Sequence, residues 1–86
     1  GVVPNPFNPM AQVKFDLPRS GKVKLAVFDL RGRMVRELVS GQMEAGSHQV
    51  RWNGRDNRGQ MSAAGVYFAR LSSADGAQTV KMVLAK

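Results

Sequence analysis

Apolar and polar side chains alternate through most of the chain, and turn-forming residues interrupt this alternation about every ten residues. Neighbouring side chains of a β-strand point to opposite faces of its sheet, so each alternating stretch gives a strand one apolar face. The pattern is clearest in two early stretches, whose apolar positions are Val13, Phe15 and Leu17, then Val23, Leu25 and Val27. A chain built in this way is expected to be all-β, with helices nearly absent.

Turn residues set the expected order of the strands. A turn at 18–21 follows the stretch 11–17, and this strand and the next are expected to form an antiparallel hairpin. Segment 34–39 also fits a helical spacing, but it is short and lies between Gly32 and Gly41, which favours a strand. Further strands are expected after Gly46, over 65–71 and over 79–84, with a loop of tight turns at 53–60.

Six or seven short strands bury their apolar faces most simply as two antiparallel sheets packed face to face. We therefore expect an immunoglobulin-like antiparallel β-sandwich of about seven short strands. Trp52 is the only tryptophan and lies on the apolar side of its strand, so we place it at the centre of the core. The chain has 86 residues and no cysteine, so one small domain must be held by apolar packing without disulfides.

The first ten residues differ from the rest of the chain. Three of the four prolines lie between positions 4 and 9, where they hold the backbone extended and remove amide donors. Residues 1–10 are therefore predicted to be a proline-rich lead-in that Phe7 anchors to the sandwich. Residues 11–86 are predicted to form the sandwich itself.

No group of side chains suited to catalysis or metal binding stands out. The only histidine, His48, lies among alternating strand residues and is expected to be half-buried beside Val50. The six acidic residues are scattered over turns, and none lies in an apolar stretch as a catalytic acid does. The loop 53–60 has two arginines where a calcium loop needs oxygen ligands, so turn geometry explains it better. The sequence predicts a protein that is not an enzyme and has no cofactor or metal.

A net charge of +7 raises the question of a nucleic-acid partner. Proteins that bind single strands need exposed aromatic rings for base stacking, whereas Phe15 and Trp52 occupy expected core positions. A solvated basic surface explains the charge better, so no nucleic acid is expected as a partner. An anionic glycolipid or polysaccharide at a cell surface stays open as a partner. No apolar run approaches the ~20 residues of a membrane span, so no transmembrane segment is predicted.

Several motifs in a fixed order resemble one family. They are Pro4-Asn5-Pro6-Phe7-Asn8-Pro9, Phe15-Asp16-Leu17-Pro18, Val27-Phe28-Asp29-Leu30-Arg31-Gly32-Arg33, Ala45-Gly46-Ser47-His48, Trp52-Asn53-Gly54-Arg55-Asp56-Asn57-Arg58-Gly59, Gly65-Val66-Tyr67-Phe68 and Lys81-Met82-Val83-Leu84-Ala85-Lys86. Together they are similar to the type A C-terminal sorting domains of the type IX secretion system, over essentially the whole chain. One departure is Ala63, where many sorting domains have proline. The middle of the chain also resembles the immunoglobulin-like domain of FlgD, the flagellar hook-capping protein.

The resemblance to sorting domains implies a non-catalytic module at the end of a larger exported protein. The partners that it implies are an upstream cargo domain in the same precursor, the outer-membrane secretion translocon, a sortase-like peptidase and anionic lipopolysaccharide. The implied route leads through the periplasm of a Gram-negative bacterium to the cell surface or the medium. Two alternatives remain, which are a scaffold domain of the flagellar hook cap and a carbohydrate-binding accessory module of a secreted hydrolase.

Candidates for recognition of the sorting signal lie in the last third of the chain. Gly65 is expected to permit close approach of backbones where its strand starts, and the Tyr67 hydroxyl to bond a neighbouring turn. The last strand either completes the core or pairs with a receptor as a free edge. The recognition candidates are Gly65, Tyr67, Thr79, Lys81, Met82, Val83, Leu84 and Lys86, and the structural residues are Phe7 and Trp52.

Overall fold

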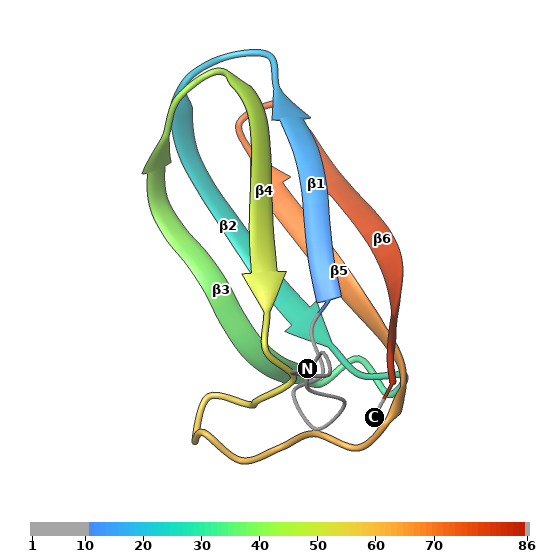
Figure 1. Cartoon of the computed structure of the whole chain (residues 1–86). Coiled ribbons are helices and arrows are strands. Elements are labelled where there is room, and N and C mark those ends of the chain that lie inside the picture. Colours follow the sequence, from blue (N-terminus) through green and yellow to red (C-terminus); the bar gives the residue numbers. More distant parts are fainter. Residues whose placement is uncertain (1–10, 86) are drawn as a thin grey trace, which may run out of the picture.

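A computed structural model describes residues 11–85 of the chain, which contain six β-strands and no helix. The strands are β1 (Ala11–Leu17), β2 (Gly21–Phe28), β3 (Met34–Met43), β4 (Gly46–Trp52), β5 (Gly65–Ser73) and β6 (Gly76–Leu84). They form a two-stranded sheet, β1-β4, and a four-stranded sheet in the order β3-β2-β5-β6 (Figure 1). The all-β, immunoglobulin-like sandwich is confirmed, with six strands in this part of the chain. Phe7 and Lys86 lie outside the described residues, so the predicted lead-in over 1–10 stays a prediction.

The expected hairpin between the first two strands is wrong. β1 pairs with β4, from Ala11 opposite Trp52 to Leu17 opposite Gly46, whereas β2 pairs with β3 on one side and β5 on the other. The link that begins at Pro18 carries the chain from one sheet to the other. The two alternating strands therefore lie in different sheets, and both bury their apolar sides in the core without sharing hydrogen bonds.

Trp52 forms the centre of the core, as predicted. Its side chain is fully buried, its ring meets the Tyr67 ring edge-on at a centroid distance of 5.0 Å, and its indole N–H donates to the Arg55 carbonyl oxygen at 2.9 Å. The one polar atom of the indole is therefore hydrogen-bonded, and burial of the ring leaves no unsatisfied donor. The other core residues are Val13, Phe15, Leu17, Val23, Leu25, Val27, Tyr67, Ala69, Leu71, Met82 and Leu84.

Two strands on one side of the core face four on the other, so the larger sheet is covered unevenly. The inward side chains of its central strands, β2 and β5, are buried. On β3 the apolar side chains that pack against the core are only half-buried, and on β6 burial is restricted to Met82 and Leu84. Val80 shares the inner face of β6 with these two residues but remains 46% exposed. The core is therefore concentrated under β2 and β5.

Two irregularities in β3 explain why its sequence also fits a helical spacing. The pairing with β2 shifts between Leu25 and Ala26, which leaves Leu38 without a partner, and shifts again before Phe28, which leaves Val35 without one. A bulge of this kind changes the alternation of side chains. Leu38 and Val39, although adjacent, both pack against the core. The predicted strand is confirmed, and it runs further than expected.

Candidate functional site

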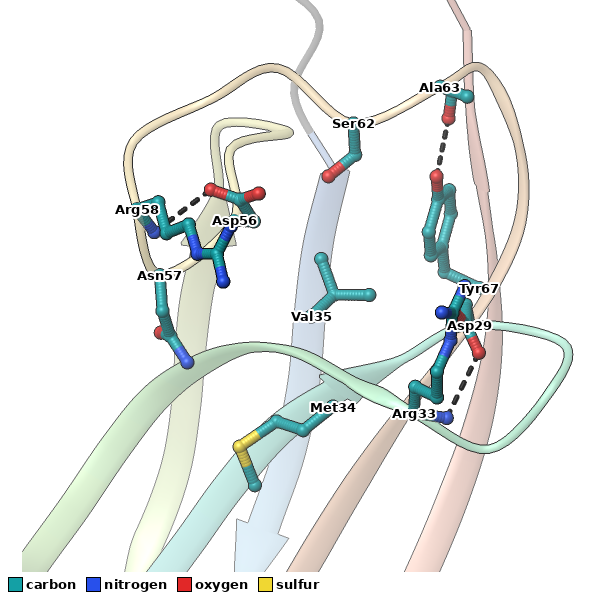
Figure 2. A pocket seen from close by; sticks show the side chains of 10 residues that line it. All are labelled: Asp29, Arg33, Met34, Val35, Asp56, Asn57, Arg58, Ser62, Ala63 and Tyr67. Carbon is teal, nitrogen blue, oxygen red and sulfur yellow. Dashed lines mark hydrogen bonds and ion pairs between the residues drawn. The ribbon is translucent and has the colours of Figure 1, made fainter.

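An open hollow of about 530 Å³ lies at one end of the sandwich. Two loops form it, one between β2 and β3 and the other between β4 and β5, with Val35 and Tyr67 among the lining residues (Figure 2). Each loop presents an aspartate and an arginine to the hollow, which are Asp29 with Arg33 and Asp56 with Arg58. More polar side chains line this hollow than line the one beside Phe15 and His48. We therefore treat it as the candidate site.

Asp29 organises the first loop. One of its carboxylate oxygens accepts the backbone N–H groups of Arg31 at 2.9 Å and Arg33 at 3.0 Å, and the other accepts Nε of Arg33 at 3.1 Å. Gly32 supplies the left-handed backbone that closes the turn, with φ of 83°. The Asp29 side chain is therefore committed to holding its own loop.

The same hydrogen bonds lower the pKa of Asp29. The backbone N–H of Arg33 has the largest effect, burial opposes it, and the N–H of Arg31 and the Arg33 side chain add smaller effects in the same direction. A carboxyl whose pKa falls on folding stabilises the folded state above its unfolded pKa, and this contribution is lost as the pH falls through the folded value.

We therefore expect Asp29→Asn to lower the midpoint of thermal unfolding at pH 7, because it removes the negative charge to which the backbone N–H groups of Arg33 and Arg31 and the Arg33 side chain donate. The difference between the variant and the wild type should shrink as the pH is lowered below about 4, where the aspartate of the unfolded chain is protonated. Thermal scans by circular dichroism between pH 2 and pH 7 measure this. If the difference in unfolding midpoint between the variant and the wild type stays constant across that range, the charge of the Asp29 carboxylate does not stabilise the fold.

Asp56 organises the second loop in the same way. Its carboxylate accepts the backbone N–H groups of Arg58 and Gln60, both at 2.9 Å, and Gly59 has φ of 85°. The backbone hydrogen bonds also match. In each segment the N–H of the aspartate donates to the carbonyl oxygen of the residue four positions later, and the carbonyl oxygen of the aspartate accepts the N–H of the glycine. The segments Asp29-Leu30-Arg31-Gly32-Arg33 and Asp56-Asn57-Arg58-Gly59-Gln60 are thus two copies of one turn.

The correspondence between the two turns was missed from the sequence, although the shared spacing of aspartate, arginine and glycine could have revealed it. Its geometry confirms the interpretation of 53–60 as a loop of tight turns. Among residues 11–85 no three histidine, cysteine, aspartate or glutamate side chains gather as metal ligands do.

Asn57 joins the second loop to the outer edge of β3. Its backbone N–H donates to the carbonyl oxygen of Val35 at 3.0 Å, and its side-chain oxygen accepts the N–H of Glu37 at 3.0 Å. The Arg36 guanidinium adds a bond to the carbonyl oxygen of Asp56 at 3.0 Å. The loop therefore satisfies polar groups that an edge strand otherwise leaves open, and it shields this part of β3 from pairing with another strand.

Tyr67 ties the second loop to the core. Its hydroxyl donates to the carbonyl oxygen of Ala63 at 2.6 Å (Figure 2). Its ring packs against Trp52. The predicted bond from this hydroxyl to a neighbouring turn is present. Gly65 serves a different purpose from the one expected, because no atom lies within 4 Å of the position that a Cβ would take. The glycine is needed for its φ of 148°, which other residues rarely adopt.

We expect Tyr67→Phe to lower the free energy of unfolding by about 1 kcal/mol, because it removes one hydrogen bond and keeps the buried ring. Urea unfolding followed by tryptophan fluorescence measures this, since Trp52 remains in place. Amide exchange of the 53–64 loop should also become faster. A variant with unchanged stability and unchanged exchange means that the bond to Ala63 does not hold the loop.

The family model for the FlgD Ig-like domain matches residues 7–81, which is most of the chain. The chain belongs to the FlgD Ig-like domain family. Among solved structures, FlgD from P. aeruginosa matches with a TM-score of 0.68 and 28% identity, covering 87% of this chain and 59% of that one. FlgD from Xanthomonas campestris, described for the hook capping essential for flagellar assembly, matches with a TM-score of 0.62 and 26% identity, covering 91% and 56%. A search of curated proteins finds no match.

The chain thus spans less than two thirds of either solved FlgD chain. The resemblance to the immunoglobulin-like domain of the hook-capping protein is confirmed. The resemblance to sorting domains stays a prediction.

This FlgD Ig-like domain brings most of the recognition candidates onto one hairpin. Gly65 lies opposite Leu84, and Tyr67 lies opposite Met82, in the pairing of β5 with β6. Met82 and Leu84 are buried in the core, whereas the exposed candidates on β6 are Thr79, Lys81 and Val83. The candidates therefore divide into core residues and surface residues. β6 both completes the core and forms an edge of its sheet.

His48 is a half-buried strand residue, as predicted, although its main neighbour differs from the expected one. Its ring stacks on Phe15 with 5.5 Å between centroids, and it donates a ring N–H to the carbonyl oxygen of Glu44 at 2.6 Å. The adjacent Ser47 hydroxyl bonds Asp16 instead of the imidazole. This histidine is therefore engaged in structural contacts.

No helix within residues 11–85 is long and apolar enough to cross a membrane.

Proposed function

We propose that this FlgD Ig-like domain is a non-catalytic assembly module of a larger exported protein of the hook-capping type. The observation that carries the proposal is the family match over residues 7–81, together with the two FlgD structures that cover most of the chain. Because the chain spans only 59% and 56% of those proteins, it represents one part of such an assembly factor.

The candidate site supports a scaffold role. Both of its aspartates accept backbone N–H groups of their own loops, and Asn57 fastens the second loop to β3. Tyr67 fastens the end of the same loop from the side of the core. Side chains used in this way fix the shape of a surface, which suits contacts with other proteins better than proton transfer.

A chimaera tests this proposal. The immunoglobulin-like domain of P. aeruginosa FlgD is replaced by this chain, and swimming is measured in a strain that lacks its own FlgD. We expect the chimaera to restore flagella and measurable swimming. The matched control carries Trp52→Ala in the transplanted domain and should not restore them, because its core is damaged. A chimaera that is stable and exported in normal amount but leaves the cells without flagella contradicts the proposal.

A sorting module of the type IX secretion system is the second candidate. The observation in its favour is that β6 is an edge of the four-stranded sheet and carries exposed candidates at Thr79, Lys81 and Val83. An edge strand offers backbone groups to which a translocon component can add a strand. A sortase-like peptidase and anionic lipopolysaccharide belong to this second candidate as partners.

The second candidate is tested with a cargo fusion. A fluorescent protein with a signal peptide is joined to the front of this chain and produced in a bacterium that has a type IX system. The sorting role predicts fluorescence at the cell surface or in the medium, and its loss in a strain without the outer-membrane translocon. Retention of a folded fusion in the periplasm of both strains excludes the role. Because the first test depends on flagella and the second on secretion, the two candidates are separated.

A further inference from the structure

The outer face of the four-stranded sheet carries an apolar surface at the end where the two loops lie. We call it the outer patch and define it as Phe28, Met34, Val66, Phe68 and Val83. The strand pairing makes it continuous, because Met34 lies opposite Phe28, Phe28 lies opposite Phe68, and Val66 lies opposite Val83. Each of the four strands, which lie side by side in the order β3-β2-β5-β6 (Figure 1), contributes at least one residue. The patch therefore extends across the whole width of the sheet.

The outer patch is accessible to a partner. Val83 is 62% exposed and Met34 is 43% exposed, and the other three side chains are half-buried. Leu30, which is 71% exposed, lines a shallow depression together with Val66 and continues the apolar surface into the first loop. Single exposed apolar residues are ordinary on a protein surface, whereas a contiguous group across several strands is typical of an interaction site.

Basic side chains lie on the same face beside the outer patch. Lys81 of β6 lies opposite Phe68 of β5, and Arg70 lies two residues further along β5. Lys24 of β2 lies opposite Ser72 of β5. The only ion pairs within residues 11–85 join Arg19 to Asp75 and Arg33 to Asp29. Lys24, Arg70 and Lys81 therefore have no carboxylate partner there. Among strand residues that the pairing brings to this face, Glu37 is the one acid.

We infer that the outer patch is a docking surface for an acidic amphipathic segment of another protein. Apolar side chains of that segment would cover the rings of Phe28 and Phe68, while its carboxylates would meet Lys24, Arg70 and Lys81. Complementary charge gives such an interface its specificity, and burial of the apolar centre gives it affinity. This inference does not depend on which exported protein carries the domain.

Two other occupants fit the surface less well. A second copy of the chain brings another charge of +7 and the same three cations to the interface, so the copies repel each other. An anionic membrane matches the positive charge of this face, but the apolar face of a membrane-bound segment lies about 5 to 10 Å deep in the lipid interface. Phe28 and Phe68 are half-buried in a sheet face and do not project in this way.

A synthetic peptide provides the probe. It has about 18 residues, with leucine along one helical face and glutamate elsewhere, so that its helix of about 27 Å is longer than the width of four strands. A matched peptide has lysine in place of each glutamate. We expect the glutamate peptide to bind the 86-residue chain in fluorescence anisotropy at low salt and to bind more weakly as salt is raised. The lysine peptide should not bind.

Matched variants locate the binding surface. Val83→Ser and Lys81→Glu should each weaken binding about tenfold, which corresponds to about 1.4 kcal/mol. Val80→Ser changes an exposed valine on the inner face of the same strand, and Lys14→Glu makes the same change of charge on β1. Both controls should bind within about twofold of the wild type. Thermal unfolding of each variant verifies that the fold is intact.

Five outcomes overturn the inference. Four of them are no binding of the glutamate peptide at about millimolar concentration, equal binding of the two peptides, equal losses in the control variants, and binding only to vesicles that contain phosphatidylglycerol. Self-association in analytical ultracentrifugation that Val83→Ser abolishes also overturns it, because the second copy is then the occupant.

Discussion

Replacing Trp52 with alanine is expected to lower the free energy of unfolding by about 3 to 5 kcal/mol. The ring is fully buried, it packs against Tyr67, and its N–H bonds the Arg55 carbonyl oxygen. Because a small domain has a total stability of about 5 to 10 kcal/mol, the variant should lose a large part of it. Urea unfolding followed by far-ultraviolet circular dichroism measures the change, since the substitution removes the fluorescent ring.

Trp52→Phe is the matched control. It retains an aromatic ring in the core but removes the donor to Arg55, so we expect a smaller loss than for alanine. If the alanine and phenylalanine variants are equally destabilised, the hydrogen bond and not the packing of the ring determines the contribution of this residue. A loss below about 1 kcal/mol for alanine contradicts the central position of Trp52.

Leu84→Ala is expected to lower the free energy of unfolding by about 2 to 5 kcal/mol. Leu84 is 1% exposed and belongs to the core, although it lies near the end of the last strand. The measurement is again urea unfolding, here followed by the fluorescence of Trp52. This large loss is the expected sign that β6 is an integral part of the sandwich.

Val83→Ala serves as its control, because the adjacent side chain points to the outer face and is 62% exposed. It should change the stability by less than about 0.5 kcal/mol. If Leu84→Ala and Val83→Ala have equally small effects, β6 does not complete the core. The core position of Leu84 also affects deletion experiments. Deletion of residues 80–86 removes Met82 and Leu84 from the core, so it damages the fold in addition to removing the strand that a receptor would recognise.

Alternation in the sequence is enough to predict the inward faces of the strands. Val13, Phe15 and Leu17 are buried as expected, because a side chain's position along a strand determines the face to which it points. The same pattern does not determine which strands pair. β1 and β2 have equivalent alternation, and only the crossing at Pro18 separates them into different sheets.

The candidate site was less predictable than the core. The turns around Asp29 and Asp56 follow local rules, and the glycines at 32 and 59 indicate them in the sequence. The contact of Asn57 with β3 joins residues that are 20 positions apart, and no local signal specifies it. The Tyr67 hydroxyl bonds the Ala63 carbonyl oxygen, four residues earlier in the preceding turn, as the likeness to a tyrosine corner predicts. Bonds within one turn were therefore accessible from the sequence, whereas long-range bonds were not.

The uneven layers have a consequence for local opening. The inner faces of β2 and β5 are buried, whereas those of β3 and much of β6 are only partly covered. Amide hydrogens in the two central strands should therefore exchange with deuterium only when the whole domain unfolds, and those of the flanking strands should exchange through smaller fluctuations. Either flank can then rearrange to meet a partner while the indole and its neighbours keep their packing.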